Sequence, residues 1–96
     1  MKINDDDLIT QLADIKHWLI TEIDGVKAIY KEYRTENFNS ALNIANTVSQ
    51  IADKENHHPQ INIKWGSCTI FWWTHDVNGV SDKDIELAKL CDAELG

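Results

Sequence analysis

The spacing of the apolar residues changes several times along the chain, and each change indicates a different element of secondary structure. Three aspartates at residues 5–7 precede an apolar group that begins at Leu8. This predicts a short first helix with acidic residues at the positive end of its dipole. Residues 17–23 and 26–34 are both rich in strand-forming residues, and Asp24-Gly25 lies between them. A turn dipeptide between two such segments predicts a β-hairpin.

A longer helix is predicted in the middle of the chain, over residues 37–54, where apolar residues recur at steps of three and four. Asn37 or Thr35 can cap its start. The helix must end before Pro59, because the residue ahead of a proline disfavours the helical conformation. The repeating apolar positions are Phe38, Ala41, Leu42, Ala45, Val48, Ile51 and Ala52.

A second pair of strands is predicted after the proline. Residues 61–65 and 68–73 form alternating segments, and Gly66-Ser67 lies between them as a turn. The later strand is apolar on both faces, so one face can pack against helices. Phe71 and Trp73, on the other face, are then either core residues or an interaction surface.

The last part of the chain predicts a third helix. Ser81 and Asp84 have the spacing of a capping box, and the apolar positions that follow end near residues 93–95. The predicted order is therefore α-β-β-α-β-β-α, with the strands arriving as hairpins. We expect one α+β domain over residues 1–96: a four-stranded antiparallel sheet with two longer helices packed on one face, plus a short N-terminal helix.

Composition and charge narrow the functional classes. The chain has 16 acidic and 9 basic residues, a net charge of -7 and 43% hydrophobic residues. Such a surface repels phosphate backbones and anionic lipids, so we expect no nucleic-acid and no membrane partner. No segment resembles a membrane span or a secretory signal, and Cys68 and Cys91 fit reduced thiols better than a disulfide framework. These features predict a cytoplasmic protein.

The histidines are the clearest candidates for chemistry. His57 and His58 leave the long helix just before Pro59, and His75 follows the last strand. If that strand ends beside the C-terminus of the long helix, the three imidazoles converge and can exchange protons near neutral pH. The alternative is that the His57-His58 pair is only a polar loop and that His75 is a strand-end residue with a local partner.

A zinc site is a second interpretation of these histidines, because three neutral imidazoles can bind zinc. However, adjacent histidines point in different directions and lack the spacing of a helical zinc motif, which favours acid–base work. Neither Ser67 nor Ser81 has the context of a nucleophile elbow. His17, beside Trp18, is interpreted as a structural residue of the first strand.

At these positions the sequence resembles the pterin-4a-carbinolamine dehydratase family. The stretch over residues 74–88, THDVNGVSDKDIELA, is similar to the family throughout, and the resemblance extends more loosely over nearly the whole chain. The signature residues are Asp53, His57, His58, Pro59, Trp65, Thr74, His75, Asp76 and Asp84, and the upstream apolar matches are Trp18, Ile29, Tyr33, Phe38 and Ala41.

The resemblance implies a four-stranded α+β fold and a lyase activity. Family members dehydrate the 4a-hydroxytetrahydropterin left by aromatic amino acid hydroxylases to quinonoid dihydropterin, which recycles the tetrahydropterin. They use no cofactor or metal, and the pterin is the substrate. By position, His57, His58 and His75 are the catalytic set, with one ring protonating the leaving hydroxyl and another accepting the ring proton. The substrate-binding positions implied in this way are Asp53, Pro59, Trp65, Thr74, Asp76 and Asp84.

The resemblance also bears on partners. Family members associate, so a homodimer or homotetramer is expected, and Phe71 and Trp73 are consistent with such contacts. Many members carry a tryptophan two residues after the proline, where this chain has Ile61. Some relatives act in assembling other proteins. A non-enzymatic interaction or assembly protein on the same scaffold is therefore the alternative function.

Overall fold

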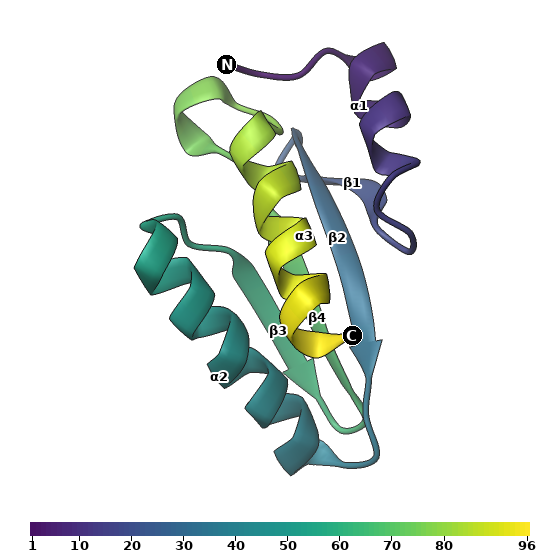
Figure 1. Cartoon of the computed structure of the whole chain (residues 1–96), viewed down its shortest axis with the longest axis vertical. Coiled ribbons are helices and arrows are strands. Elements are labelled where there is room, and N and C mark those ends of the chain that lie inside the picture. The colour runs from purple at the N-terminus through teal and green to yellow at the C-terminus, as the bar shows by residue number, and fades with distance from the viewer.

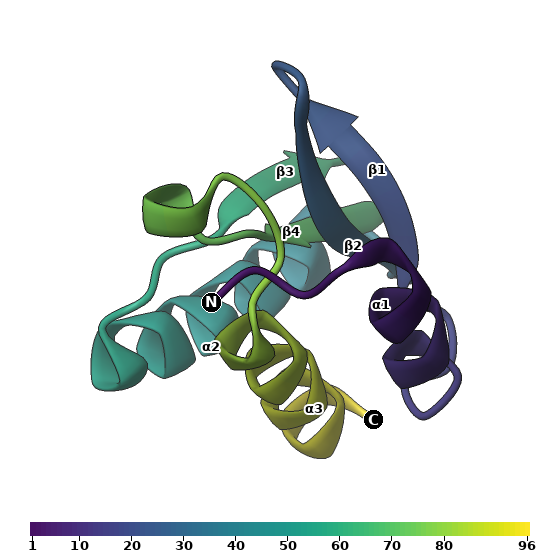
Figure 2. The same ribbon diagram turned by 90° about the horizontal axis from the view of Figure 1, so that it is seen from above.

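The computed structural model describes residues 1–96 and confirms the predicted α+β fold (Figure 1). The helices α2 and α3 cover one face of a four-stranded sheet, and the other face is open (Figure 2). The elements are α1 (Asp5–Leu12), β1 (Leu19–Ile23), β2 (Val26–Arg34), α2 (Phe38–Glu55), β3 (Gln60–Lys64), β4 (Ser67–Trp72), the 3-10 helix η1 (His75–Val77) and α3 (Asp82–Leu95). The turn η1 was not predicted.

The sheet is antiparallel with the strand order β1-β2-β4-β3, so β2 and β4 are central. Ile29 of β2 pairs with Trp72 of β4, and both side chains are fully buried beneath the helices. The neighbouring pair, Tyr30 and Phe71, lies on the open face, where the two rings stack with centroids 5.5 Å apart. The apolar character of β4 on both faces therefore reflects one core face and one uncovered face.

The helix α2 begins and ends within one residue of its predicted bounds. Asn37 caps it, since its side-chain oxygen accepts from the backbone N–H of Ser40 at 2.8 Å. The buried stripe is Ala41, Ala45, Val48 and Ala52. Phe38 and Leu42, which the periodicity placed in the same stripe, are exposed. They lie on the flank of the helix, because a single sheet and one neighbouring helix cover only part of its circumference.

Three predicted strand ends are wrong. Trp73 follows β4 and is not part of it, because the strand ends at Trp72. His17 is not a strand residue: it has a φ of 72° and lies in the turn before β1. Trp65 is not in β3 either, because the chain reverses at Trp65-Gly66, where Gly66 has a φ of 85°. In each place the alternating pattern of side chains extends beyond the residues that pair with a neighbouring strand.

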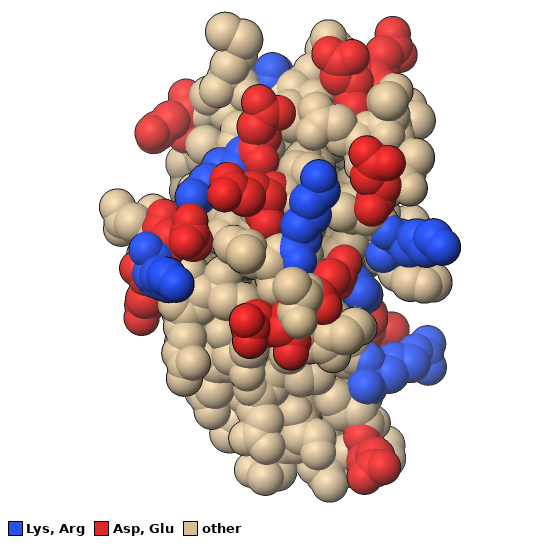
Figure 3. All heavy atoms as spheres, viewed as in Figure 1, with Lys and Arg blue, Asp and Glu red and all other residues tan.

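The surface agrees with the acidic composition. Acidic side chains outnumber basic ones over the upper and middle part of the helical face, whereas the lower part, over the start of α2, is largely uncharged (Figure 3). None of the helices has both the length and the apolar character needed to cross a bilayer.

Candidate active site

The C-terminal end of α2 directs His57 and His58 out of the helix. Asn56 adopts the left-handed conformation, with φ 52° and ψ 44°. The N–H of Asn56 then donates to the carbonyl of Asp53 at 3.3 Å, and the N–H of His57 donates to the carbonyl of Ala52 at 3.1 Å. This pair of bonds is the Schellman pattern that ends a helix sharply. The two histidines therefore follow the helix at once, before Pro59 begins the approach to β3.

The end of β4 supplies the opposite wall. Trp73 and Thr74 follow the strand, and His75 begins the turn η1. The N–H of Thr74 donates to the carbonyl of Gly79 at 2.8 Å, which closes the loop across residues 74–79. The loop holds His75 close to the end of α2, although the two positions are far apart along the chain.

These two segments line an open cavity of about 250 Å³ in which the three histidines come together. Its lining is Asn56, His57, His58, Trp73, Thr74, His75 and Asp76. The convergence expected from the order of the elements is therefore present. Sequence reasoning did not assign Asn56 or Trp73 to this cavity. The available signal was their position, since each directly neighbours a signature segment.

His57 is held by a buried carboxylate. Its Nε2 lies 2.7 Å from Oδ1 of Asp84 and 3.1 Å from the backbone carbonyl of Trp73. Both neighbours are acceptors, so Nε2 carries a proton and donates it. Proton exchange by this ring must then take place at Nδ1.

Asp84 is fully buried, and its second oxygen is also occupied. Oδ2 accepts from the hydroxyl of Thr74 at 2.7 Å and from the N–H of Ser81 at 2.9 Å. The predicted capping box at the start of α3 is present. The same carboxylate thus caps α3 and orients His57, and it lies beneath the cavity as support for the ring.

The other two histidines are more exposed. Nε2 of His58 lies 3.0 Å from Oδ1 of Asp53, and both side chains are largely in solvent. The ring of His75 packs edge-on against the indole of Trp73, with centroids 5.4 Å apart. The site therefore combines one anchored imidazole with two that solvent can reach.

The structure places some of the remaining predicted site residues at the cavity and others outside it. Thr74 and Asp76 line the cavity, and Asp53 reaches its rim through His58. Pro59 leads away from the cavity and is not part of its lining.

The structure places Trp65 away from the other predicted site residues. It is 73% exposed and lies in the turn between β3 and β4, beside Arg34 and Lys64. β3 runs away from Pro59, so the turn is on the order of 20 Å from the histidines at the usual rise per strand residue. Trp65, which the resemblance implies as a substrate-binding position, therefore does not line the histidine cavity of this chain.

Metal binding and thiolate chemistry have little support in the geometry. No group of three His, Cys, Asp or Glu side chains is placed so that it could hold a metal ion. Burial raises the pKa of the Cys68 and Cys91 thiols to about 11, so neither is a thiolate at neutral pH.

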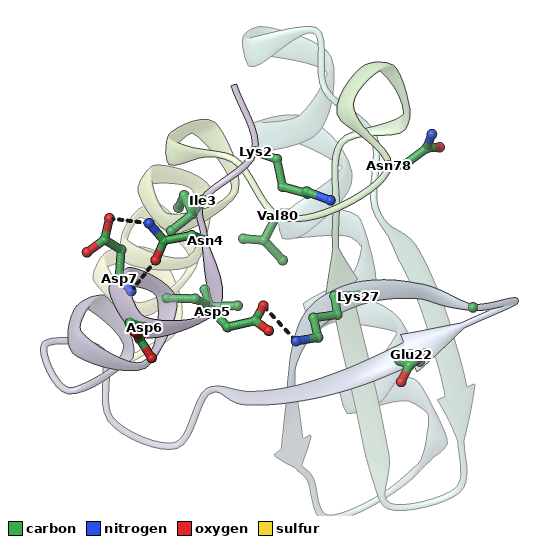
Figure 4. A pocket seen from close by; sticks show the side chains of 12 residues that line it. Lys2, Ile3, Asn4, Asp5, Asp6, Asp7, Glu22, Lys27, Asn78 and Val80 are labelled. Carbon is green, nitrogen blue, oxygen red and sulfur yellow. Dashed lines mark hydrogen bonds and ion pairs between the residues drawn. The ribbon is translucent and has the colours of Figure 1, made fainter.

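A larger, open hollow lies between α1, the β1–β2 hairpin and residues 78–80 (Figure 4). It is lined mainly by polar residues, and an ion pair between Lys27 and Asp5, 2.7 Å long, crosses it. No histidine reaches this hollow, so the candidate active site is the smaller cavity at the end of α2.

Fold and site together define a small α+β protein with a histidine-lined cavity. The protein-family model described as pterin 4 alpha carbinolamine dehydratase matches residues 1–94. The chain therefore belongs to the pterin-4-alpha-carbinolamine dehydratase family.

Individual relatives agree with this assignment. A protein of Hahella chejuensis, provisionally named as a pterin-4-alpha-carbinolamine dehydratase, is 35% identical over 96% of this chain and 82% of its own length. A protein of Syntrophotalea carbinolica with the same provisional name is 41% identical over 86% of this chain and 74% of its own length.

Two solved structures share the fold. A crystal structure of a transcriptional coactivator/pterin dehydratase from Brucella melitensis has a TM-score of 0.86 and 24% identity, with 100% of both chains covered. A pterin dehydratase-like protein described as a RuBisCO assembly factor in the alpha-carboxysome has a TM-score of 0.66 and 15% identity, over 82% of this chain and 89% of that one.

Proposed function

We propose that this chain dehydrates 4a-hydroxytetrahydropterin to quinonoid dihydropterin by histidine acid–base catalysis. The observation that carries the proposal is the meeting of His57, His58 and His75 in one cavity, with His57 anchored on buried Asp84. Membership of the dehydratase family supports the substrate class. The proposed reaction needs no cofactor and no metal, because the pterin is the substrate.

The reaction suits imidazole rings. The C4a–oxygen bond breaks, the departing hydroxyl takes up a proton to leave as water, and a ring nitrogen of the pterin loses a proton. One histidine supplies the first proton and another accepts the second, and positioned groups of this kind each contribute on the order of 10²–10⁴ in rate. Because Nε2 of His57 already donates to Asp84 and the Trp73 carbonyl, His57 acts through Nδ1. In the same proposal, Asp53, Thr74 and Asp76 contact the pterin or orient a ring that does.

The test is a stopped-flow dehydration assay with freshly generated 4a-hydroxytetrahydropterin. We expect His57→Ala and His75→Ala each to lower the rate about 100-fold or more, because each removes a proton-transfer group. The control is His17→Asn, which changes a histidine outside the cavity and keeps a residue that tolerates the positive φ at that position. Circular dichroism verifies the fold of each variant. Equal rates in the parent and in the cavity variants would exclude this catalytic assignment.

The alternative, a non-enzymatic interaction or assembly protein, has one specific observation in its favour. The open face of the sheet carries the stacked Tyr30 and Phe71 rings and the exposed Leu19. A solved structure with this fold is described as a RuBisCO assembly factor, which supports such a role. This alternative predicts negligible turnover in the same assay together with a stable complex. A fully active parent chain that binds no other protein would count against it.

We also propose that the chain forms a homodimer or homotetramer and works in the cytoplasm. Residues 38–52 of α2 contain no charged side chain, and Phe38 and Leu42 are exposed among them. Two copies with a net charge of -7 repel one another elsewhere, so this uncharged surface is the favourable place for them to meet. Light scattering of the purified chain tests the association. The cytoplasmic location is supported by the two free, buried thiols.

A further inference from the structure

Trp73 occupies an unusual place among the tryptophans. Trp18 and Trp72 are buried in the core, and Trp65 is exposed at the distant turn. Trp73 is partly exposed and lines the histidine cavity. It is also the only hydrophobic side chain in that lining. Ile61, at the position where many family members carry a tryptophan, packs against the core instead.

Trp73 also contacts two of the three histidines. Its indole lies against the ring of His75, with centroids 5.4 Å apart and planes inclined by 67°. Its backbone carbonyl accepts the Nε2 proton of His57 at 3.1 Å. The position of Trp73 is therefore coupled to the positions of His57 and His75, two of the rings proposed to transfer protons.

We propose that Trp73 is the stacking platform for the flat ring system of the substrate. This inference rests on the proposed function and extends it, since neither the family signature nor the catalytic histidines include this residue. A conjugated bicyclic heterocycle gains most from contact with another flat π surface, as nucleobases do on aromatic side chains. The cavity of about 250 Å³ is small and suits a two-ring ligand better than a drug-sized one.

The surrounding groups fit a ring placed on the indole. Asn56, Thr74 and Asp76 provide polar atoms that can bond to the edge of a heterocycle rich in donors and acceptors. A ring parallel to the indole is inclined by about the same 67° to His75. In that orientation an in-plane nitrogen of the imidazole can point at a substituent standing out of the pterin plane, as the 4a-hydroxyl does.

The experiment compares Trp73→Leu, Trp73→Phe and Phe71→Leu. Phe71 is the matched control, because it is an aromatic residue two positions earlier in the chain, near the end of β4, but lies outside the cavity. Two quantities are measured: the affinity for the stable compound 7,8-dihydropterin by calorimetry, and kcat and KM for dehydration. We expect Trp73→Leu to weaken binding and raise KM about tenfold with little change in kcat. Trp73→Phe should stay within about threefold of the parent, and Phe71→Leu should match the parent.

The outcomes separate this inference from the proposed function. If the parent is active and Trp73→Leu binds 7,8-dihydropterin as tightly as the parent, the platform is overturned while the dehydratase stands. A loss of kcat and thermal stability with unchanged binding would make Trp73 a structural residue, which also overturns the platform. If the parent binds the pterin through Trp73 yet shows no turnover, the dehydratase fails and the platform stands. A parent that binds no pterin overturns both.

Discussion

At the scale of a single residue, the carboxylate of Asp84 connects two parts of the chain that are separate in sequence. It accepts from Ser81 three residues earlier and from His57 twenty-seven residues earlier. The first contact could be predicted, because a capping box is a local pattern. The second could not, since it depends on how the start of α3 docks against the end of α2. A buried carboxylate with hydrogen bonds at both oxygens is costly to alter, because each lost bond leaves a donor unpaired.

We therefore expect Asp84→Asn to lower the free energy of unfolding by about 1–3 kcal/mol, measured by urea denaturation. The amide keeps one acceptor oxygen but turns an NH2 group toward donors, so it cannot satisfy His57, Thr74 and the Ser81 N–H together. The control is Asp82→Asn, in the same first turn of α3 but exposed. Equal losses in the two variants would point to the helix dipole instead of the buried network.

At the scale of elements, α2 is the part that the sequence predicted best. Its regular spacing, its cap at Asn37 and the downstream Pro59 are local signals, and the observed bounds differ from the prediction by one residue at each end. The left-handed end at Asn56 was not predicted, although asparagine is one of the few residues that adopts this conformation readily. Its geometry matters because it determines the direction in which His57 and His58 leave the helix.

Asn56→Ala should lower the free energy of unfolding by about 1 kcal/mol, because alanine is strained at a φ of 52°. Asn56→Gly should match the parent or exceed it slightly, since glycine carries no such strain. Asn46→Ala, on the exposed side of the same helix, is the control and should be neutral or slightly stabilising. Urea unfolding of the three variants measures the differences. An Asn56→Ala variant as stable as Asn56→Gly would contradict the assigned conformation.

At the scale of the whole molecule, Asp92 of α3 connects the helix layer to the sheet. Its carboxylate accepts from Trp18 at 3.0 Å, from Lys31 at 2.7 Å and from Tyr33 at 2.8 Å. Burial alone would raise the pKa of Asp92, but the hydrogen bonds from Lys31, Tyr33 and Trp18 outweigh it and hold the pKa below its usual value of 3.8. No pattern in the local sequence around Asp92 predicts these contacts.

This cluster predicts a dependence of stability on pH. A carboxyl group whose pKa is lowered by folding stabilises the folded state above its unfolded pKa, near 3.8, and this stabilisation is lost as the pH falls through the folded pKa. We expect Asp92→Asn to be less stable by about 2 kcal/mol at pH 7 and to lose less stability than the parent between pH 5 and about pH 2. Urea denaturation across this pH range measures both effects. Asp14→Asn, an exposed change without these partners, should follow the parent curve, and an Asp92→Asn curve parallel to the parent would refute the role of the cluster.

Trp65 and Trp73 illustrate what can be predicted from the sequence and what depends on the tertiary structure. Helices, turns and caps depend on neighbours a few residues away, so their order, the antiparallel hairpins and the histidine candidates could be derived from the sequence itself. Both tryptophans end a predicted strand and look alike at that level. Only the register of β3 on β4 and the docking of the helices place Trp73 at the cavity and Trp65 at the far turn. The same packing brings His57 to Asp84, because contacts between distant segments are selected by how whole elements fit together.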